Sequence, residues 1–244
     1  MNLPTMKLSA LLASVALLFS CSTAHVQTLD DLLGKAKKVV PLSEADAGNG
    51  LKEALEIGIS KGADALSQTD GYFKSPYKIL LPQEAQTVIS RLKAVPGFQN
   101  LEADLTERLN RAAEDAARKA KPIFVNAIRQ MTFKDAMNIL MGEKNAATMY
   151  LDKTTRTPLY GEFQPVITES LEKVNAVSLW QSATTAYNKI PFVSKVDTRL
   201  DDYVTNRALD GLFARIAVEE LDIRTNFSSR TSDLLKRVFA RQDK

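Results

Sequence analysis

Apolar residues recur every three or four positions along most of the chain. This spacing places them on one face of an α-helix, and residues 85–92 are a clear example. No long stretch alternates apolar and polar residues, and residues 79–81 form the one short strand-like piece. The pattern predicts an all-α fold, with a single globular domain of about eight to ten helices over residues 50–241.

Several residues mark helix boundaries. Thr132 is followed three positions later by Asp135, which is typical of a helix N-cap, and Gly142 is expected to end that helix. Pro158 suits the first turn of a later helix. Pro165 lies inside the apolar pattern that follows, so we expect it to kink or split that helix.

Two stretches break the helical pattern. They are TDGYFKSPYKILLP at 69–82 and NKIPFVSKVDTR at 188–199, and both mix proline, aromatic residues and lysine. Irregular loops on a rigid scaffold often carry binding residues. We therefore expect a binding groove between helices, rimmed by these two loops.

The beginning of the chain has the plan of a secretion signal. A lysine at position 7 precedes an uncharged apolar run that is too short to span a membrane, which predicts a signal peptide over residues 1–20. Residues 18–21, LFSC, resemble a lipobox, the motif after which a cysteine is lipidated. This predicts a lipid anchor at Cys21 and a tether over residues 21–49 that contains a short amphipathic helix.

The same segment allows a second cleavage. Ser22-Thr23-Ala24 is also a small-residue cleavage site, and cutting after Ala24 leaves a soluble periplasmic protein. The lipobox interpretation is favoured because it places the sole cysteine at its modification site. Serine rather than aspartate after that cysteine favours the outer membrane, with the domain facing the periplasm.

Composition excludes several function classes. The chain has 244 residues, of which 25% are charged, and its formal net charge is +3, without a basic block of the nucleic-acid-binding kind. The one cysteine, Cys21, and the one histidine, His25, both precede the domain. We therefore expect no disulfide, no His/Cys metal site, no histidine-based triad and no cofactor in the domain, and no nucleic-acid partner.

Glu220 is the most informative polar residue. It lies inside an apolar helical stripe, four positions before Arg224. A buried carboxylate is costly unless it is paired or protonated. A structural ion pair with Arg224 is the favoured interpretation, and an acid with a raised pKa in an envelope hydrolase is the alternative.

Three further residues are candidates for ligand binding. Arg111 is able to hold a carboxylate or phosphate through two nitrogens, although pairing with Glu114 on the same helix is the more ordinary role. Tyr187 and Asn188 introduce the second irregular loop. The favoured interpretation is that the Asn188 side chain braces that loop, and the alternative is that the loop forms a pocket wall.

Several long phrases, in this order along the chain, resemble bacterial envelope proteins that carry the DUF4197 domain. The resemblance covers about residues 50–239, and members of the family commonly begin with a secretion or lipoprotein signal. The phrases are GLKEALEIGISKGADALS, NRAAEDAARKAKPIFVNAIRQMTFKDAMNILMG, AATMYL, YNKIPFV and DDYVTNRALDGLFARIAVEE. The resemblance implies the fold and the location, and it supplies no catalytic residues.

Three functional hypotheses follow. The first is a lipid-anchored, non-enzymatic binding module for a partner protein or a small apolar ligand. The second is an envelope hydrolase that works through carboxylates such as Glu220, and the third is a purely structural envelope protein. An enzyme needs polar groups that converge in one cleft, whereas a binder needs an apolar or aromatic pocket.

Overall fold

The computed structural model describes residues 43–196 and 199–240, and all regular structure in this part of the chain is helical. The all-α prediction is confirmed, and the number of helices lies in the expected range. The elements are α2 (Glu44–Leu66), α3 (Gln83–Leu92), α4 (Leu101–Ala117), α5 (Ala120–Gln130), α6 (Phe133–Leu140), α7 (Ala146–Lys173), α8 (Ala176–Asn188), α9 (Leu200–Thr225), the 3-10 turn η1 (Phe227–Ser229) and α10 (Asp233–Phe239).

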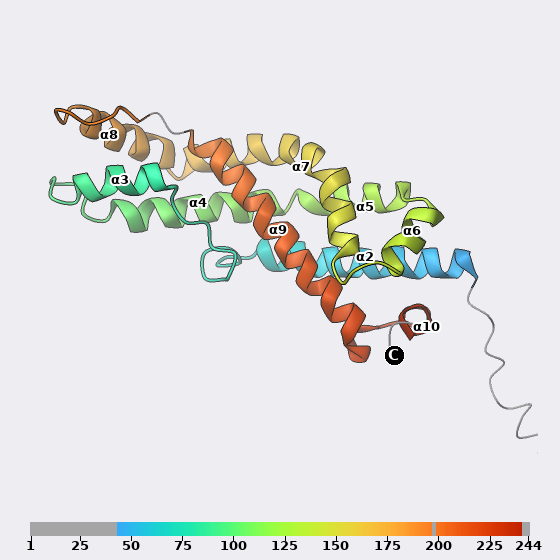
Figure 1. Ribbon diagram of the computed structural model, residues 1–244. Helices are drawn as coiled ribbons and strands as arrows, with labels where there is room; N and C mark the ends of the chain where they lie inside the picture. Colours follow the sequence, from blue (N-terminus) through green and yellow to red (C-terminus); the bar gives the residue numbers. More distant parts are fainter. Residues whose placement is uncertain (1–42, 197–198, 241–244) are drawn as a thin grey trace, which may run out of the picture. The chain divides into compact units, whose positions relative to one another are not determined.

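The long helix α9 organises the packing. It crosses α2, α4 and α7 and packs against each of them (Figure 1). One apolar core runs through the described helices, and its aromatic members include Phe124 and Phe213, whose rings meet edge to face. Burial of this surface is the main source of stability in a helical domain of this size.

Helix α2 begins at Glu44, ahead of residue 50, where the sequence suggests that the domain starts. Ser43 and Asp46 form a capping box at its first turn. Gly48 and Gly50 then let other helices approach closely. A Cβ at Gly48 would lie 2.6 Å from the Phe133 ring of α6, and one at Gly50 would lie 2.5 Å from a methyl group of α10.

Helix α7 corrects the predicted role of Pro158. The helix begins at Ala146, so Pro158 lies inside it rather than in its first turn. Pro165 does not split the helix, which continues to Lys173. Helix α7 does change direction along its length (Figure 1), as expected where prolines remove backbone hydrogen bonds.

Other boundary predictions hold. Thr132 caps α6 with Asp135 in a capping box, and α6 ends at Leu140, just before Gly142. Residues 79–81 form no strand in the described structure. The signal peptide, Cys21, His25 and the short amphipathic helix of the tether lie outside the described residues.

Candidate functional site

Glu220 and Arg224 form a buried pair on α9, with only 5% and 4% of their side chains exposed. The Nε of Arg224 donates to Oε1 of Glu220 at 2.9 Å, and Nη2 lies 2.8 Å from the same oxygen. The guanidinium also donates to the carbonyl oxygens of Ile139 and Leu140, at the end of α6. The geometry therefore agrees with the favoured interpretation, a structural ion pair between Glu220 and Arg224.

The carboxylate of Glu220 also caps α7. Its Oε1 accepts from the Ala147 backbone N–H at 3.0 Å, and its Oε2 accepts from the Thr148 N–H and hydroxyl at 2.8 and 2.7 Å. The first backbone N–H groups of a helix have no partner within the helix and favour a negative charge. The pair of Glu220 and Arg224 thus joins α6, α7 and α9, and the acceptor positions of Glu220 are occupied.

A second buried carboxylate, Glu114 of α4, holds the first irregular loop. Its Oε1 accepts from the backbone N–H groups of Tyr72 and Phe73, both at 3.2 Å. Its Oε2 accepts from Nη1 of Arg111 at 2.8 Å. This hydrogen bond raises the pKa of Arg111 above its ordinary value, so the guanidinium stays charged.

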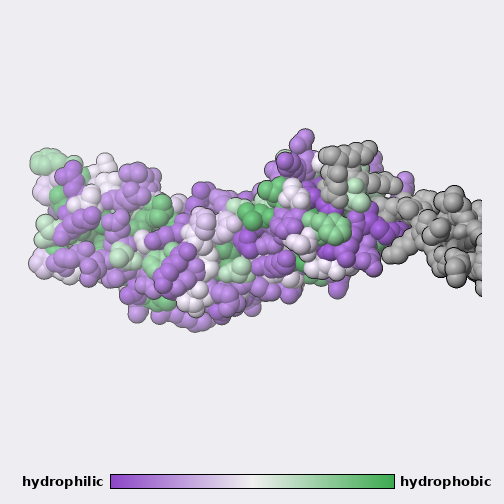
Figure 2. Space-filling model, turned by 90° about the horizontal axis from the view of Figure 1, so that it is seen from below, coloured by the Kyte–Doolittle hydropathy of each residue, from purple (hydrophilic) through white to green (hydrophobic). Residues whose placement is uncertain are grey.

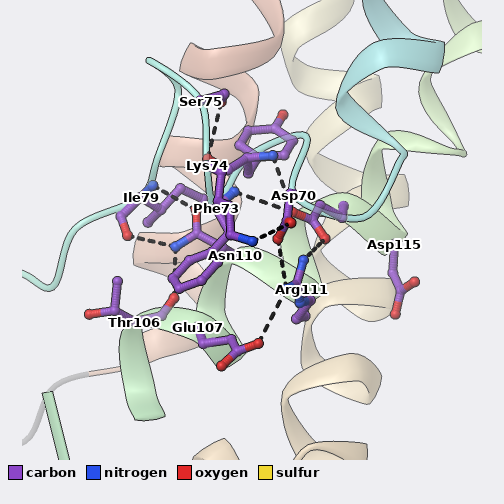
Figure 3. Close-up of polar contacts among 12 residues, drawn as sticks. Asp70, Phe73, Lys74, Ser75, Ile79, Thr106, Glu107, Asn110, Arg111 and Asp115 are labelled. Carbon is purple, nitrogen blue, oxygen red and sulfur yellow. Dashed lines mark hydrogen bonds and ion pairs between the residues drawn. The ribbon is translucent and has the colours of Figure 1, made fainter. Parts of the chain in front are cut away.

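Arg111 has further acidic neighbours. Its Nη2 lies 2.8 Å from Asp70 and 3.2 Å from Glu107, and its guanidinium lies 5.3 Å from the centre of the Phe73 ring (Figure 3). Hydrogen bonds from Lys74 and then from Arg111 hold the pKa of Asp70 below its usual range. The donors of Arg111 thus already bind carboxylates of its own chain.

Hydrogen bonds of Asn110 and Tyr72 also hold this loop in place. The Asn110 amide pairs with both backbone groups of Ile79, accepting at 2.8 Å and donating at 2.9 Å. The hydroxyl of Tyr72 donates to the Ala208 carbonyl of α9 at 2.7 Å. Burial, followed by the charge of Glu114, raises the pKa of Tyr72, so this hydroxyl keeps its proton.

Tyr187 and Asn188 lie at the end of α8. The Tyr187 ring is buried. The Asn188 side chain donates to the Val196 carbonyl at 3.4 Å and accepts from the Val196 N–H at 3.2 Å. Asn188 thus closes the second irregular loop, which is the bracing role expected for it.

A cavity of about 280 Å³ lies beside Trp180, between the end of α7, α8 and the beginning of α9. Its apolar lining comes from Trp180 and three aliphatic residues, and Arg199, from the second irregular stretch, borders it. The described lining comprises Thr168, Leu171, Glu172, Val177, Trp180, Gln181, Thr184, Arg199, Leu200 and Asp201. Six of the ten lining residues are polar and three of these are charged, so the cavity combines an aromatic wall with polar and charged groups, an arrangement that suits a small ligand.

A wider hollow of about 490 Å³ lies beside the first irregular loop. Phe73, Lys78 and Leu80 line it from the loop, and Lys93 and several residues of α4 line the opposite side. It is more open than the cavity at Trp180. Each irregular stretch thus borders one hollow.

The five residues predicted for ligand binding fall in three places. Glu220 and Arg224 are together, Tyr187 and Asn188 are neighbours on α8, and Arg111 belongs to the network on α4. Trp180 and Arg199, which line the cavity between α7, α8 and α9, were missed as binding residues. The available signals were that Trp180 is the chain's one tryptophan and that Arg199 lies in the second irregular stretch.

Two kinds of feature are absent from the described residues. Residues 43–196 and 199–240 place no group of three or more His, Cys, Asp or Glu side chains where they could hold a metal ion. Among the helices in this same part of the chain, none is long and apolar enough to span a membrane.

Fold and site together define an all-α protein whose buried carboxylates brace helix ends and loops, with a cavity at its tryptophan. A family model described as "Protein of unknown function (DUF4197)" matches residues 41–240. The chain belongs to the DUF4197 family. Comparison with curated proteins found no match, and comparison with solved structures found none either.

Proposed function

We propose that this protein is a non-catalytic binding module of the bacterial cell envelope, anchored by a lipid at Cys21. Its ligand is small and largely apolar, and it binds in the cavity at Trp180. The observation that carries this proposal is the shape and lining of that cavity, which lies between three helices and has an indole on its wall.

The lining supports a ligand with an apolar body and a polar end. Trp180, Leu171 and Val177 supply apolar surface, whereas Gln181 and Thr184 supply hydrogen-bonding groups. The volume of about 280 Å³ is close to the lower limit of ordinary ligand pockets. A small molecule or a single acyl chain suits this space better than a protein segment does.

The hydrolase alternative through Glu220 has weaker support. A general acid needs a proton to give and a substrate within reach. Glu220 instead accepts hydrogen bonds from two backbone N–H groups, a threonine hydroxyl and a guanidinium. All of these partners belong to its own chain, and the pocket that Glu220 and Arg224 border has a volume of only about 20 Å³, which is too small for a substrate.

The sole tryptophan provides a direct test. N-Phenyl-1-naphthylamine is a neutral, apolar fluorophore that accepts energy from an excited indole. We expect it to bind the purified full chain and to emit when Trp180 is excited. Val177→Phe adds bulk to the cavity wall and should weaken this binding by roughly tenfold or more.

Ser178→Phe is the matched control, because Ser178 is the next residue on α8 and does not line the cavity. It should leave the transfer signal unchanged. Binding that is equally strong in Val177→Phe, or no energy transfer from Trp180 in the wild type, would contradict the proposed site.

The anchor has a separate test. Metabolic labelling with palmitate should label the wild type, and Cys21→Ala should move the protein to the soluble periplasmic fraction. Several acyl chains on one cysteine make such an attachment stable, whereas a single chain would be marginal. A wild type without label would instead favour cleavage after Ala24.

A further inference from the structure

The second irregular loop carries the most exposed large apolar side chain of the described residues. Phe192 is 108% exposed, and Pro191 beside it is exposed as well. The loop is well defined, since the side chain of Asn188 bonds both backbone groups of Val196 across its base. Phe192 is thus presented to solvent by a closed loop.

The backbone at Phe192 is strained. Its φ is +63°, in the left-handed region that bulky residues rarely adopt. Such strain persists only where neighbouring structure enforces it, and it is concentrated at functional sites. Folding therefore places a phenyl ring in water through an unfavourable backbone conformation, which indicates selection for something other than stability.

A second loop lies beside this one. Helices α3 and α8 pack together, and each ends at the same end of the helical domain, at the left in Figure 1. The loop after α3 carries an exposed Val95 and Pro96, and Gly97 there has a φ of +92°. Figure 2 shows hydrophobic residues exposed at this same end.

The charged residues within these two loops are all lysines. Lys189 and Lys195 flank the Pro-Phe tip and are exposed, and neither has an ion-pair partner in the described structure. Lys93 begins the other loop and lies 3.5 Å from Glu102. No acidic residue occurs within 93–98 or 189–196. We call residues 93–98 and 189–196 together the tip surface.

We propose that the tip surface docks onto an anionic lipid bilayer, with Phe192 inserted among the acyl chains and lysines on the headgroups. Aromatic side chains are favoured at the membrane–water boundary, and each lysine near an anionic surface strengthens attachment. The first turn of α2 lies at the opposite end of the helical domain (Figure 1).

A fluorescent reporter in the full chain tests this docking. The Cys21→Ser background frees the chain of its one cysteine, and Ser194→Cys adds a labelling site within the tip surface while keeping Phe192. The chain is reconstituted into vesicles with phosphatidylglycerol or into phosphatidylcholine alone. With phosphatidylglycerol, the emission should shift to the blue and be quenched by quenchers attached to acyl chains. A separate variant, Met149→Cys in the same Cys21→Ser background, carries the reporter at an exposed position of α7. This reporter should not respond to either kind of vesicle.

Two variants separate the apolar and the charged contributions. Phe192→Ser should lower the ratio of inserted to free tip by roughly tenfold or more. The pair Lys189→Gln and Lys195→Gln should lower it by about 30-fold with phosphatidylglycerol. Lys121→Gln with Lys144→Gln removes the same charge elsewhere, from exposed lysines, and should have little effect.

Three results would overturn the proposal. One is a reporter that stays in water with both vesicles. Another is a response that is the same for both lipids and does not depend on Phe192. The third is a reporter that ignores vesicles but is shielded by solubilised envelope proteins, which would assign the tip surface to a protein partner.

Discussion

Two buried carboxylates, Glu114 and Glu220, are used in nearly the same way in different surroundings. Each accepts two backbone N–H groups from a distant segment, and each pairs with an arginine of its own helix. The difference lies in the arginines. Arg224 is 4% exposed and donates to two carbonyl oxygens, whereas Arg111 is 28% exposed and contacts two more carboxylates.

This difference indicates that burial of the arginine determines how much stability is lost when its carboxylate partner is removed. When one partner of a buried pair is removed, the other is left charged in a medium that solvates it poorly. Arg224 has almost no access to water that would reduce this penalty. Arg111 has solvent, Asp70 and Glu107 to stabilise it.

The largest expected effect is that of Glu220→Ala. It should lower the free energy of unfolding by about 3–5 kcal/mol, because it strands Arg224 and uncaps α7. Urea unfolding followed by circular dichroism measures this loss. Arg224→Ala should partly rescue the variant in a double-mutant cycle, and a coupling energy of zero would show that the two residues do not act as a pair.

Glu114→Ala should be less destabilising, by about 2 kcal/mol, because its loss leaves two backbone donors without a charged partner while Arg111 remains solvated. The same unfolding measurement applies. A loss equal to or larger than that of Glu220→Ala would mean that exposure of the arginine does not determine the cost, which would contradict the comparison.

The smallest effect concerns Asp70 and pH. Its pKa is lower in the folded state than the ordinary value of 3.8, so the carboxylate stabilises the fold above that value. This contribution is lost as the pH falls through the folded pKa. Asp70→Asn should therefore be slightly less stable than the wild type at pH 7, and the gap should narrow near pH 3.

Asp104→Asn serves as the control, because Asp104 is an exposed acid of α4 without an ion-pair partner in the described residues. It should follow the wild type at both pH values. If the gap between Asp70→Asn and the wild type widens on acidification, the pKa of Asp70 is raised rather than lowered by folding.

The position of Glu220 in an apolar stripe was enough to predict its burial and its partner, since both follow from the helical repeat on α9. Its other partners, Ala147 and Thr148, belong to α7, and nothing in the sequence around Glu220 predicts these contacts. The beginning of α7 was missed for the same reason. Asn145 makes no side-chain cap there, and the capping group is the carboxylate of another helix.

The two irregular stretches have similar compositions and different environments. Tyr72 of the first is fully buried, whereas Phe192 of the second is fully exposed. What separates them is Asn110 and Glu114, which hold the first loop from α4. Composition predicted two loops correctly, but burial depended on tertiary partners that the local sequence does not contain.

Glu220→Gln tests the central claim most directly, because it is nearly isosteric and removes only the charge and one acceptor. If Glu220 is structural and the ligand binds at Trp180, the melting temperature should fall. Energy transfer from Trp180 to N-phenyl-1-naphthylamine should then persist below that temperature with unchanged affinity. An unchanged melting temperature with loss of probe binding would contradict the account and make Glu220 a residue of the binding site.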